Sequence, residues 1–215
     1  MFRNIFMRRF KLINKYIRSG KVLDIGCSNG VFLEIFKERG WEVWGVEPSK
    51  SAEVAEKHGI KVIKSDLENA KLPPHYFDVV ILNHTLEHSD NPIKFLKIIK
   101  NLLTDEGLLF IDVPNFGSLS SRLLGKRWPY LLPNEHNFQF TKDSLTKIVR
   151  KNGYRVIHTE SRSGLFEFAN PMSEIFLSLI PPKKRFIKNI LLFPYDLLST
   201  ILSMGDSMSV IANNV

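Results

Sequence analysis

Apolar and polar positions along this chain follow two different periods. Continuous apolar runs, typical of strands buried on both faces of a sheet, begin near Lys21, Asp78 and Leu108. Between these runs, apolar residues recur every three to four positions, as on the buried face of a helix. Up to Pro114 the predicted strands and helices alternate strictly, and this pattern predicts a parallel, doubly wound α/β sheet.

The ends of individual elements follow from residues that start or stop helices. Asn91-Pro92 predicts a helix start, since a capping side chain is followed by proline in the first turn. Gly40 and Gly153 are predicted helix stops. The predicted strands are 21–25, 41–47, 61–63, 78–82, 108–113, 154–161 and 207–213, and the predicted helices are 1–18, 31–39, 51–58, 91–103 and 141–152.

The segment 166–204 reads differently from the rest of the chain. It is apolar and helix-like, and we expect Pro181-Pro182 and Pro194 to break it. Lys188 and Asp196 also interrupt its longest apolar run, so it cannot be a clean membrane-spanning helix. The segment is therefore predicted to be either a lid or an interfacial insertion.

Composition limits the function classes. Apolar residues make up 44% and charged residues 24% of the 215 residues, as in ordinary globular proteins. The single cysteine, Cys27, excludes a disulfide framework and a multi-cysteine metal site. The N-terminus lacks the apolar run of a signal peptide, which favours a cytoplasmic location.

The net charge of +8 is unevenly distributed. Residues 1–21 hold seven basic and no acidic residues, whereas the remaining 194 residues hold 23 basic and 22 acidic ones. A second basic cluster comprises Lys183, Lys184, Arg185 and Lys188. A nucleic-acid partner is therefore not favoured, but the basic amphipathic helix within 1–20 and the segment 166–204 together suit peripheral contact with an anionic membrane.

The first predicted strand ends in a compact chemical motif. Asp24-x-Gly26-x-Ser28-x-Gly30 stands where the strand turns into a helix, so small residues let the backbone approach a ligand at the helix N-terminus. The dinucleotide fingerprint requires glycine where this chain has Ser28 and Val31, which disfavours NAD. The motif instead resembles the first motif of class I S-adenosylmethionine (SAM)-dependent methyltransferases.

Further segments extend this resemblance in family order. Glu47 ends the second strand 23 residues after Asp24, and Ser65-Asp66-Leu67 follows the third strand. Asn83-His84-Thr85-Leu86-Glu87-His88 follows the fourth and resembles a segment common in the family. Pro114-Asn115, His136, Phe140-Thr141 and Gly153-Tyr154 resemble the small-molecule branch that includes ubiquinone-type O-methyltransferases.

The resemblance implies a Rossmann-like, seven-stranded, mostly parallel sheet built from 21–165 and 205–215, with a helical insertion before the last strand. It implies SAM as methyl donor and S-adenosylhomocysteine as product, with Glu47 at the ribose and Asp66-Leu67 at the adenine. The expected cofactor residues are Asp24, Gly26, Cys27, Ser28, Asn29, Gly30, Glu47, Pro48, Asp66, Leu67 and Asn83. Ser28 departs from the family glycine, where a strained backbone is expected.

Three histidines are candidates for catalysis. His84, Glu87 and His88 have a spacing that would place them on one face of a helical turn. One histidine could be a general base, or Glu87 and His88 could only stabilise the turn. The trio could also bind a divalent metal, as in some ubiquinone-type relatives, but the sequence does not favour a metal. His136 is the other candidate base, and nearby aromatic residues (Trp128, Tyr130, Phe138) could line an acceptor pocket.

The sequence thus favours methyl transfer to a small molecule, possibly a sugar, a quinone-like compound or a lipid-linked acceptor, at oxygen. An RNA methyltransferase that uses the basic arm and a non-catalytic SAM-binding protein remain alternatives. Methylation of RNA pyrimidines through a cysteine nucleophile is disfavoured because Cys27 is the only cysteine. The Asn-Pro-Pro-Tyr segment of base-amino methyltransferases is missing, since His84-Thr85-Leu86 follows Asn83.

Overall fold

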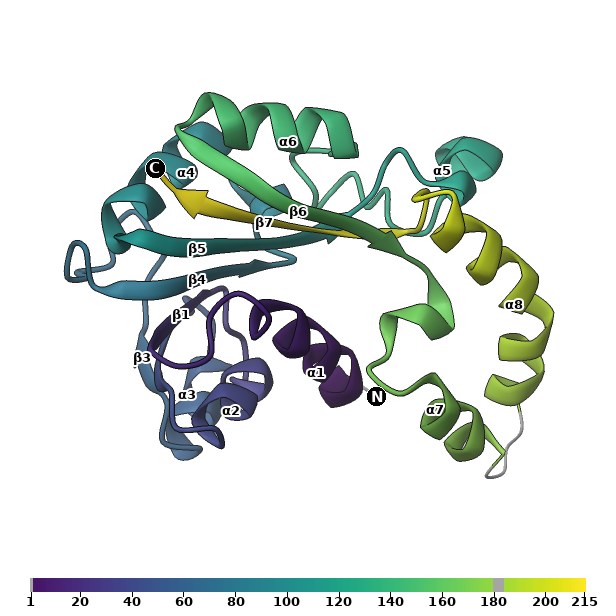
Figure 1. The fold of residues 1–215 in the computed structure, drawn as a ribbon, viewed down its shortest axis with the longest axis horizontal. Helices are drawn as coiled ribbons and strands as arrows, with labels where there is room; N and C mark the ends of the chain where they lie inside the picture. Colours follow the sequence, from purple (N-terminus) through teal and green to yellow (C-terminus); the bar gives the residue numbers. More distant parts are fainter. Residues whose placement is uncertain (1, 180–183) are drawn as a thin grey trace.

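A twisted sheet of seven strands runs through the part of the chain that the computed structural model describes, residues 2–179 and 184–215 (Figure 1). The strands are β1 (Lys21–Ile25), β2 (Glu42–Val46), β3 (Lys61–Ile63), β4 (Phe77–Asn83), β5 (Leu103–Pro114), β6 (Tyr154–Arg162) and β7 (Ser207–Asn214). Their order in the sheet is β3-β2-β1-β4-β5-β7-β6, and β7 runs antiparallel to both neighbours. The predicted Rossmann-like, mostly parallel α/β sheet is confirmed.

Helices cover both faces of this sheet. The α-helices are α1 (Phe2–Ile13), α2 (Val31–Lys37), α3 (Ala52–Lys57), α4 (Pro92–Leu102), α5 (Leu119–Leu124), α6 (Lys142–Lys151), α7 (Pro171–Ser178) and α8 (Lys184–Ile201). Short 3₁₀ turns are η1 (Leu86–His88), η2 (Gly125–Arg127) and η3 (Gly164–Glu167). In Figure 1, α4 and α6 lie above the sheet, whereas α1, α2 and α3 lie below it.

Each face of the sheet carries its own apolar core. Leu96 of α4 and Leu145 of α6 pack with Leu23 of β1 on one face. On the other face, Phe10 of α1 packs edge-on against Phe36 of α2, with ring centroids 4.9 Å apart. The strands are continuously apolar because helices bury both of their faces, as the sequence pattern predicted.

The predicted helix starts are confirmed at atomic detail. The Asn91 side chain accepts a hydrogen bond from the Lys94 backbone N–H at 3.0 Å, so it caps α4 ahead of Pro92. Thr141 and Ser144 form a reciprocal capping box at the start of α6. Polar residues at these positions satisfy amide groups that the first helical turn leaves free.

The N-terminal helix differs from its prediction in length and in role. It ends at Ile13 rather than near residue 18, and its apolar face is buried against α2. Arg3 pairs with Glu38, Arg8 with Glu160, and Arg9 with Asp112. Three of the seven basic side chains are therefore engaged with the body of the protein and do not extend from it as a free arm.

The insertion before β7 is helical, as predicted, but helix α8 runs through Pro194, where a break was expected. Proline removes one backbone hydrogen bond inside a helix and crowds the carbonyl four residues earlier, yet the chain remains helical here as far as Ile201. The predicted break at Pro181-Pro182 and the Lys183 end of the second basic cluster lie outside the described residues. None of the described helices is long and apolar enough to cross a membrane.

Candidate functional site

A pocket opens at the carboxyl ends of β1, β2 and β4, and we call it the strand-edge pocket. It has a volume of about 380 Å³. Its lining residues are Ile25, Gly26, Val46, Glu47, Pro48, Ser65, Asp66, Leu67, His84, Thr85, His88, Ser89 and Phe95. In doubly wound sheets ligands bind at this edge, where neighbouring crossover helices lie on opposite faces.

The turn after β1 has the strained, close-packed backbone that the motif predicted. Gly26 has φ of +78°, and a Cβ built there would lie 2.8 Å from the Thr85 Oγ1. Ser28 also has a positive φ, +49°, although it is not glycine. Such strain persists where surrounding contacts impose it and is frequent at functional sites.

Two carboxylates lie at this edge in different surroundings. The Glu47 carboxylate accepts hydrogen bonds from the backbone N–H groups of Ser28 and Ser49, both at 2.9 Å. Asp24 is buried, and its Oδ1 has no hydrogen-bond partner. Burial and the nearby charge of Glu47 raise the pKa of Asp24 well above its usual range, while Arg9 opposes them. An unpaired buried acceptor is costly, so Asp24 suits a hydrogen-bond donor supplied by a ligand.

Five of the predicted cofactor residues line this pocket: Gly26, Glu47, Pro48, Asp66 and Leu67. The other six do not: Asp24, Cys27, Ser28, Asn29, Gly30 and Asn83. The Cys27 side chain packs into the core on the α2 face, and burial raises the pKa of its thiol. Asn29 is exposed, and Gly30 caps α2 in the left-handed conformation. The Asn83 side chain turns to the other side of the sheet edge and accepts a hydrogen bond from Arg9 at 2.5 Å.

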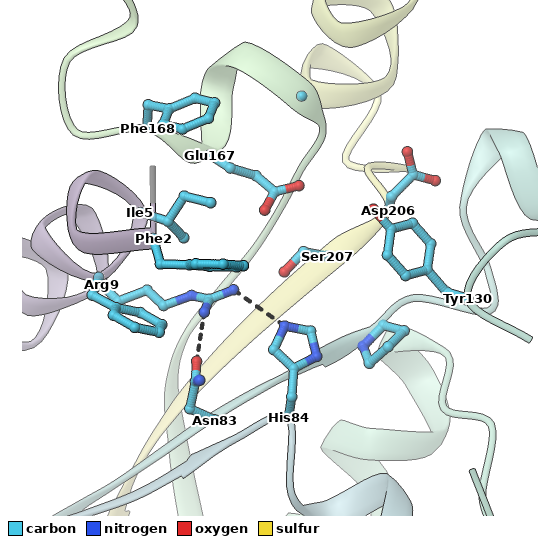
Figure 2. Close-up of a pocket in the computed structure, with 13 residues that line it drawn as sticks. Phe2, Ile5, Arg9, Asn83, His84, Tyr130, Glu167, Phe168, Asp206 and Ser207 are labelled. Atoms are coloured by element: carbon cyan, nitrogen blue, oxygen red, sulfur yellow. Dashed lines mark hydrogen bonds between the residues drawn. The ribbon is translucent and has the colours of Figure 1, made fainter. Parts of the chain in front are cut away.

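A second pocket, the α1 pocket, lies between the N-terminal helix, η3 and the start of β7 (Figure 2). Its volume is about 350 Å³. The lining residues are Phe2, Ile5, Phe6, Arg9, Asn83, His84, Pro114, Tyr130, Gly164, Glu167, Phe168, Asp206 and Ser207. Aromatic and aliphatic side chains with a few converging polar groups are typical of a small-molecule site.

Both pockets are lined by His84. Its φ is +53°, so it sits in a strained turn directly after β4 and not on the helical turn that the sequence predicted. The Nδ1 atom lies 3.3 Å from the Glu87 carboxylate, which can only accept, so Nδ1 carries the proton. Nε2 is then the unprotonated nitrogen, and its lone pair accepts a hydrogen bond from the Arg9 guanidinium at 3.4 Å.

Arg9 and Glu167 are two of the polar groups of the α1 pocket that the sequence analysis did not predict, together with Asp206 and Ser207. Arg9 donates to Asp112 at 2.6 Å, and Ser207 and Ser209 also donate to that carboxylate, at 2.8 and 2.5 Å. In Figure 2 the Glu167 carboxylate points into the pocket above Arg9. Burial chiefly raises the pKa of Glu167 to about 7, and Asp112 adds to the shift, whereas Arg9, Arg8 and His84 oppose it.

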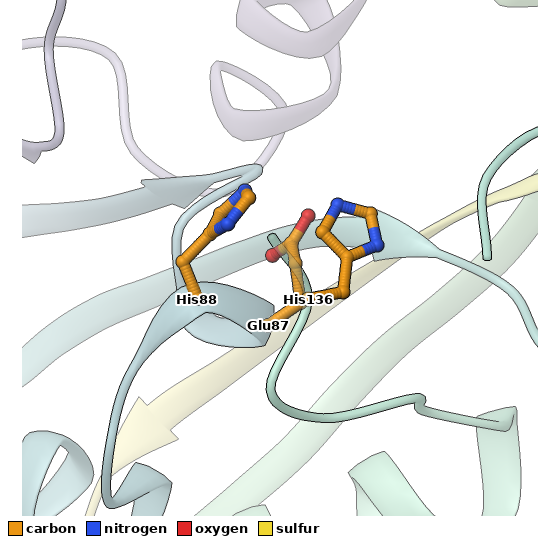
Figure 3. Close-up of side chains that lie close together, drawn as sticks. All are labelled: Glu87, His88 and His136. Carbon is orange, nitrogen blue, oxygen red and sulfur yellow. The ribbon is translucent and has the colours of Figure 1, made fainter. Parts of the chain in front are cut away.

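Glu87, His88 and His136 form the one cluster of possible metal ligands found among the described residues (Figure 3). One ligand atom of each lies within 4.8 Å of the others. The Nδ1 atoms of His88 and His136 donate to the carbonyls of Glu135 and Tyr130, at 2.7 and 3.0 Å, which leaves each Nε2 with a free lone pair. The Glu87 Oε2 is buried without a partner. These groups suit a divalent cation. They differ from the trio of the sequence-based metal alternative, in which His84 stood in place of His136.

Three comparisons with known proteins bear on this site. The family model described as a methyltransferase domain matches residues 2–159. The ubiquinone biosynthesis O-methyltransferase of Coxiella burnetii is 29% identical over 190 residues, 79% of this chain and 81% of that protein. The Neisseria meningitidis enzyme of the same name is 30% identical over 109 residues, 46% of each chain.

The chain spans about half the length, or less, of the first curated relatives that it matches. Among solved structures, a SAM-dependent methyltransferase from Archaeoglobus fulgidus superposes with a TM-score of 0.68 at 25% identity, over 97% of this chain and 92% of that one. The matched region contains the strand-edge pocket and most of the α1 pocket.

Proposed function

This chain belongs to the class I SAM-dependent methyltransferases, and from that premise we propose that it methylates a hydroxyl group of a small molecule bound in the α1 pocket. The observation that carries the proposal is that His84 lines both pockets. A group shared by a donor site and an acceptor site stands where the two substrates meet. Positioning two substrates in this way supplies most of the rate enhancement in a direct transfer.

The strand-edge pocket suits the cofactor. Bound there, SAM would supply an electrophilic methyl group on its sulfonium. Asp24, with its unpartnered buried oxygen, would accept a hydrogen bond from the amino group of the methionine part. Glu47 would bind the ribose hydroxyls, and Asp66 with Leu67 would bind the adenine. Pro48 and the backbone of the Gly26 turn would form the walls around them.

His84 would accept the proton of the acceptor hydroxyl. Its Nδ1–H is held by Glu87, so Nε2 is the nitrogen that can take the proton. Arg9 lies beside that nitrogen and would stabilise negative charge as it develops on the acceptor oxygen. Asp112 positions Arg9 through the buried ion pair. His88 and His136 each have a ligand atom within 4.8 Å of the Glu87 carboxylate and would fill the space beside it.

The first experiment is calorimetric titration of the protein with SAM and with S-adenosylhomocysteine. Glu47→Ala should weaken binding of both by about 1–3 kcal/mol, the cost of losing charged hydrogen bonds. Glu42→Ala is the matched control, because Glu42 begins the same strand and is exposed. Absence of binding to either ligand would contradict both the proposed methyl transfer and the alternative of a non-catalytic SAM-binding protein.

The second experiment measures transfer from methyl-labelled SAM to a panel of aromatic and sugar hydroxyl compounds, with amine analogues and RNA as competing acceptors. Hydroxyl methylation that falls by about 10²–10⁴-fold in His84→Ala is the expected result. Labelling confined to amines or to RNA would contradict the proposal. The alternative of an RNA methyltransferase is weakened by Arg3, Arg8 and Arg9, whose charges are engaged in ion pairs.

A further inference from the structure

Helices α7 and α8 turn their polar side chains toward the protein. Asp196 and Ser199 of α8 are 4% and 0% exposed, and Glu174 and Ser178 of α7 are both 2% exposed. The Asp196 carboxylate accepts a hydrogen bond from the Leu165 backbone N–H at 3.1 Å, which anchors α8 on η3. In a helix that faces water, polar residues occupy the outer face, so this distribution is reversed.

The outer faces of the same helices are apolar. On α8 the side chains of Ile187, Leu191, Leu198 and Ile201 follow one another at helical spacing and are 57%, 73%, 50% and 69% exposed. Such a stripe of large aliphatic residues far exceeds the scattered apolar groups of an ordinary surface. It continues on α7, where Phe176 is 64% exposed.

A neighbouring element extends the apolar surface and adds positive charge. Helix α5 adjoins the end of the insertion, since the Leu119 backbone N–H donates to the Met204 carbonyl at 2.9 Å. Leu123 of α5 is 73% exposed. Arg122, Lys126 and Arg127 are exposed on α5 and η2.

In the described segments 171–179 and 186–205, which cover α7 and most of α8, no carboxylate side chain is exposed. The acidic residues there, Glu174 and Asp196, are the buried ones. Lys188 is exposed on α8. An outward apolar stripe bordered by cations and free of acids matches an anionic lipid surface in both hydrophobicity and charge.

We propose that α5, α7 and α8 form a surface that lies on an anionic bilayer, with the aliphatic side chains of α8 inserted among the lipids. The helices would lie in the interface, because no described helix can span it. This differs from the sequence-based hypothesis, in which the N-terminal basic helix took part in the contact. The proposal does not depend on the methyl transfer, and its test uses binding alone.

The test is co-sedimentation of the full chain with lipid vesicles at low salt. One set of vesicles is phosphatidylcholine with about 30% phosphatidylglycerol, which is anionic, and the other is phosphatidylcholine alone. The variant Leu191→Gln/Leu198→Gln removes two aliphatic groups from the outer stripe. The matched control, Val54→Gln/Ile93→Gln, removes two exposed aliphatic groups from α3 and α4. Removal of residues 1–18 is unsuitable, since Phe10, Leu12 and Ile13 belong to the core.

We expect binding to the anionic vesicles, weakened by about tenfold or more in the α8 variant and unchanged in the control, since only the α8 variant removes aliphatic side chains from the lipid contact. A Leu191→Trp variant should add a blue shift of tryptophan emission on the same vesicles. Absence of binding by the intact chain would overturn the proposal. So would equal loss in both double variants, or lipid-independent dimers that only the α8 variant dissociates, because the stripe would then be an interface between copies.

Discussion

The guanidinium of Arg9 lies 2.6 Å from the carboxylate of Asp112 and joins the first helix to the fifth strand across 103 residues of sequence. Both side chains are almost fully buried, at 3% and 0% exposure. The carboxylate is also hydrogen-bonded by Ser207 and Ser209 of β7. One ion pair therefore fixes α1 to the central strands and builds the wall of the α1 pocket.

Breaking this pair should destabilise the protein strongly. Arg9→Met leaves the Asp112 carboxylate buried without its cation, which costs about 3–5 kcal/mol in free energy of unfolding. Urea unfolding followed by circular dichroism measures the change. The control is Arg3→Met, which removes an exposed pair with Glu38 and should cost about 0–1 kcal/mol. Similar losses in the two variants would mean that the Arg9 pair is no more important than a surface pair.

The stability of the protein should depend on pH through Glu167. Its pKa is about 7 in the folded state against an ordinary 4.5, so the folded state holds a proton that the unfolded state loses first. Stability from this group is therefore present below pH 4.5 and is lost as pH rises through 7. Arg8, Arg9, His84 and Asp112 are the charged groups around it.

Glu167→Gln removes this dependence. At pH 8 we expect the variant to be more stable than the parent by about 1–2 kcal/mol, a figure reduced for the partial exposure of the side chain. At pH 4 the two proteins should differ little. Thermal melts at both pH values test this. A variant that is equally destabilised at pH 4 and pH 8 would show that the pKa of Glu167 is the same in the folded and unfolded states.

Two glycines allow the effect of backbone strain to be separated from the effect of a close contact with a neighbouring side chain. Gly26→Ala and Gly40→Ala place alanine at φ of +78° and +80°, so both should lose about 1–2 kcal/mol of stability. Only at Gly26 does the new Cβ meet Thr85, whereas nothing lies within 4 Å at Gly40. We therefore expect only Gly26→Ala to weaken SAM binding, by calorimetry. Equal binding by both variants would contradict a close approach of cofactor to this turn.

Glu87, His88 and His136 should bind one divalent cation per chain, because two free imidazole lone pairs and a buried carboxylate converge there. Equilibrium dialysis with Zn²⁺ or Co²⁺ measures the stoichiometry. His136→Ala should lower the affinity by at least about tenfold. His58→Ala, next to Glu34 but outside the cluster, should not. Undiminished binding by His136→Ala would place the ion elsewhere.

Several elements could be predicted to within a residue or two. The strand at 61–63 and the caps at Asn91 and Thr141 depend on neighbouring residues alone, so local pattern was sufficient. The helix ending at Ile13 was predicted too long, since its last turn unwinds where tertiary contacts, and not periodicity, decide the end.

The candidate site divides in the same way. The positions of Gly26, Glu47 and Asp66 at the strand-edge pocket could be predicted because each follows a strand, and parallel strands bring their carboxyl ends to one edge. Arg9 and Glu167 could not be recognised as site residues. Arg9 belongs to the basic N-terminal helix and Glu167 to the insertion, and neither follows a strand of the predicted parallel sheet. The sole sequence signal for Arg9 was an arginine among the apolar positions of that helix.

By itself the sequence determined the order of strands and helices, the family and the strand ends at which the strand-edge pocket lies, because these depend on periodicity and on residues close together in the chain. Tertiary structure alone decided that Arg9 meets Asp112, that His84 lies between two pockets, and that α8 faces outward with its apolar side. Those relationships join residues far apart in the chain, and burial selects them only after the whole sheet has formed.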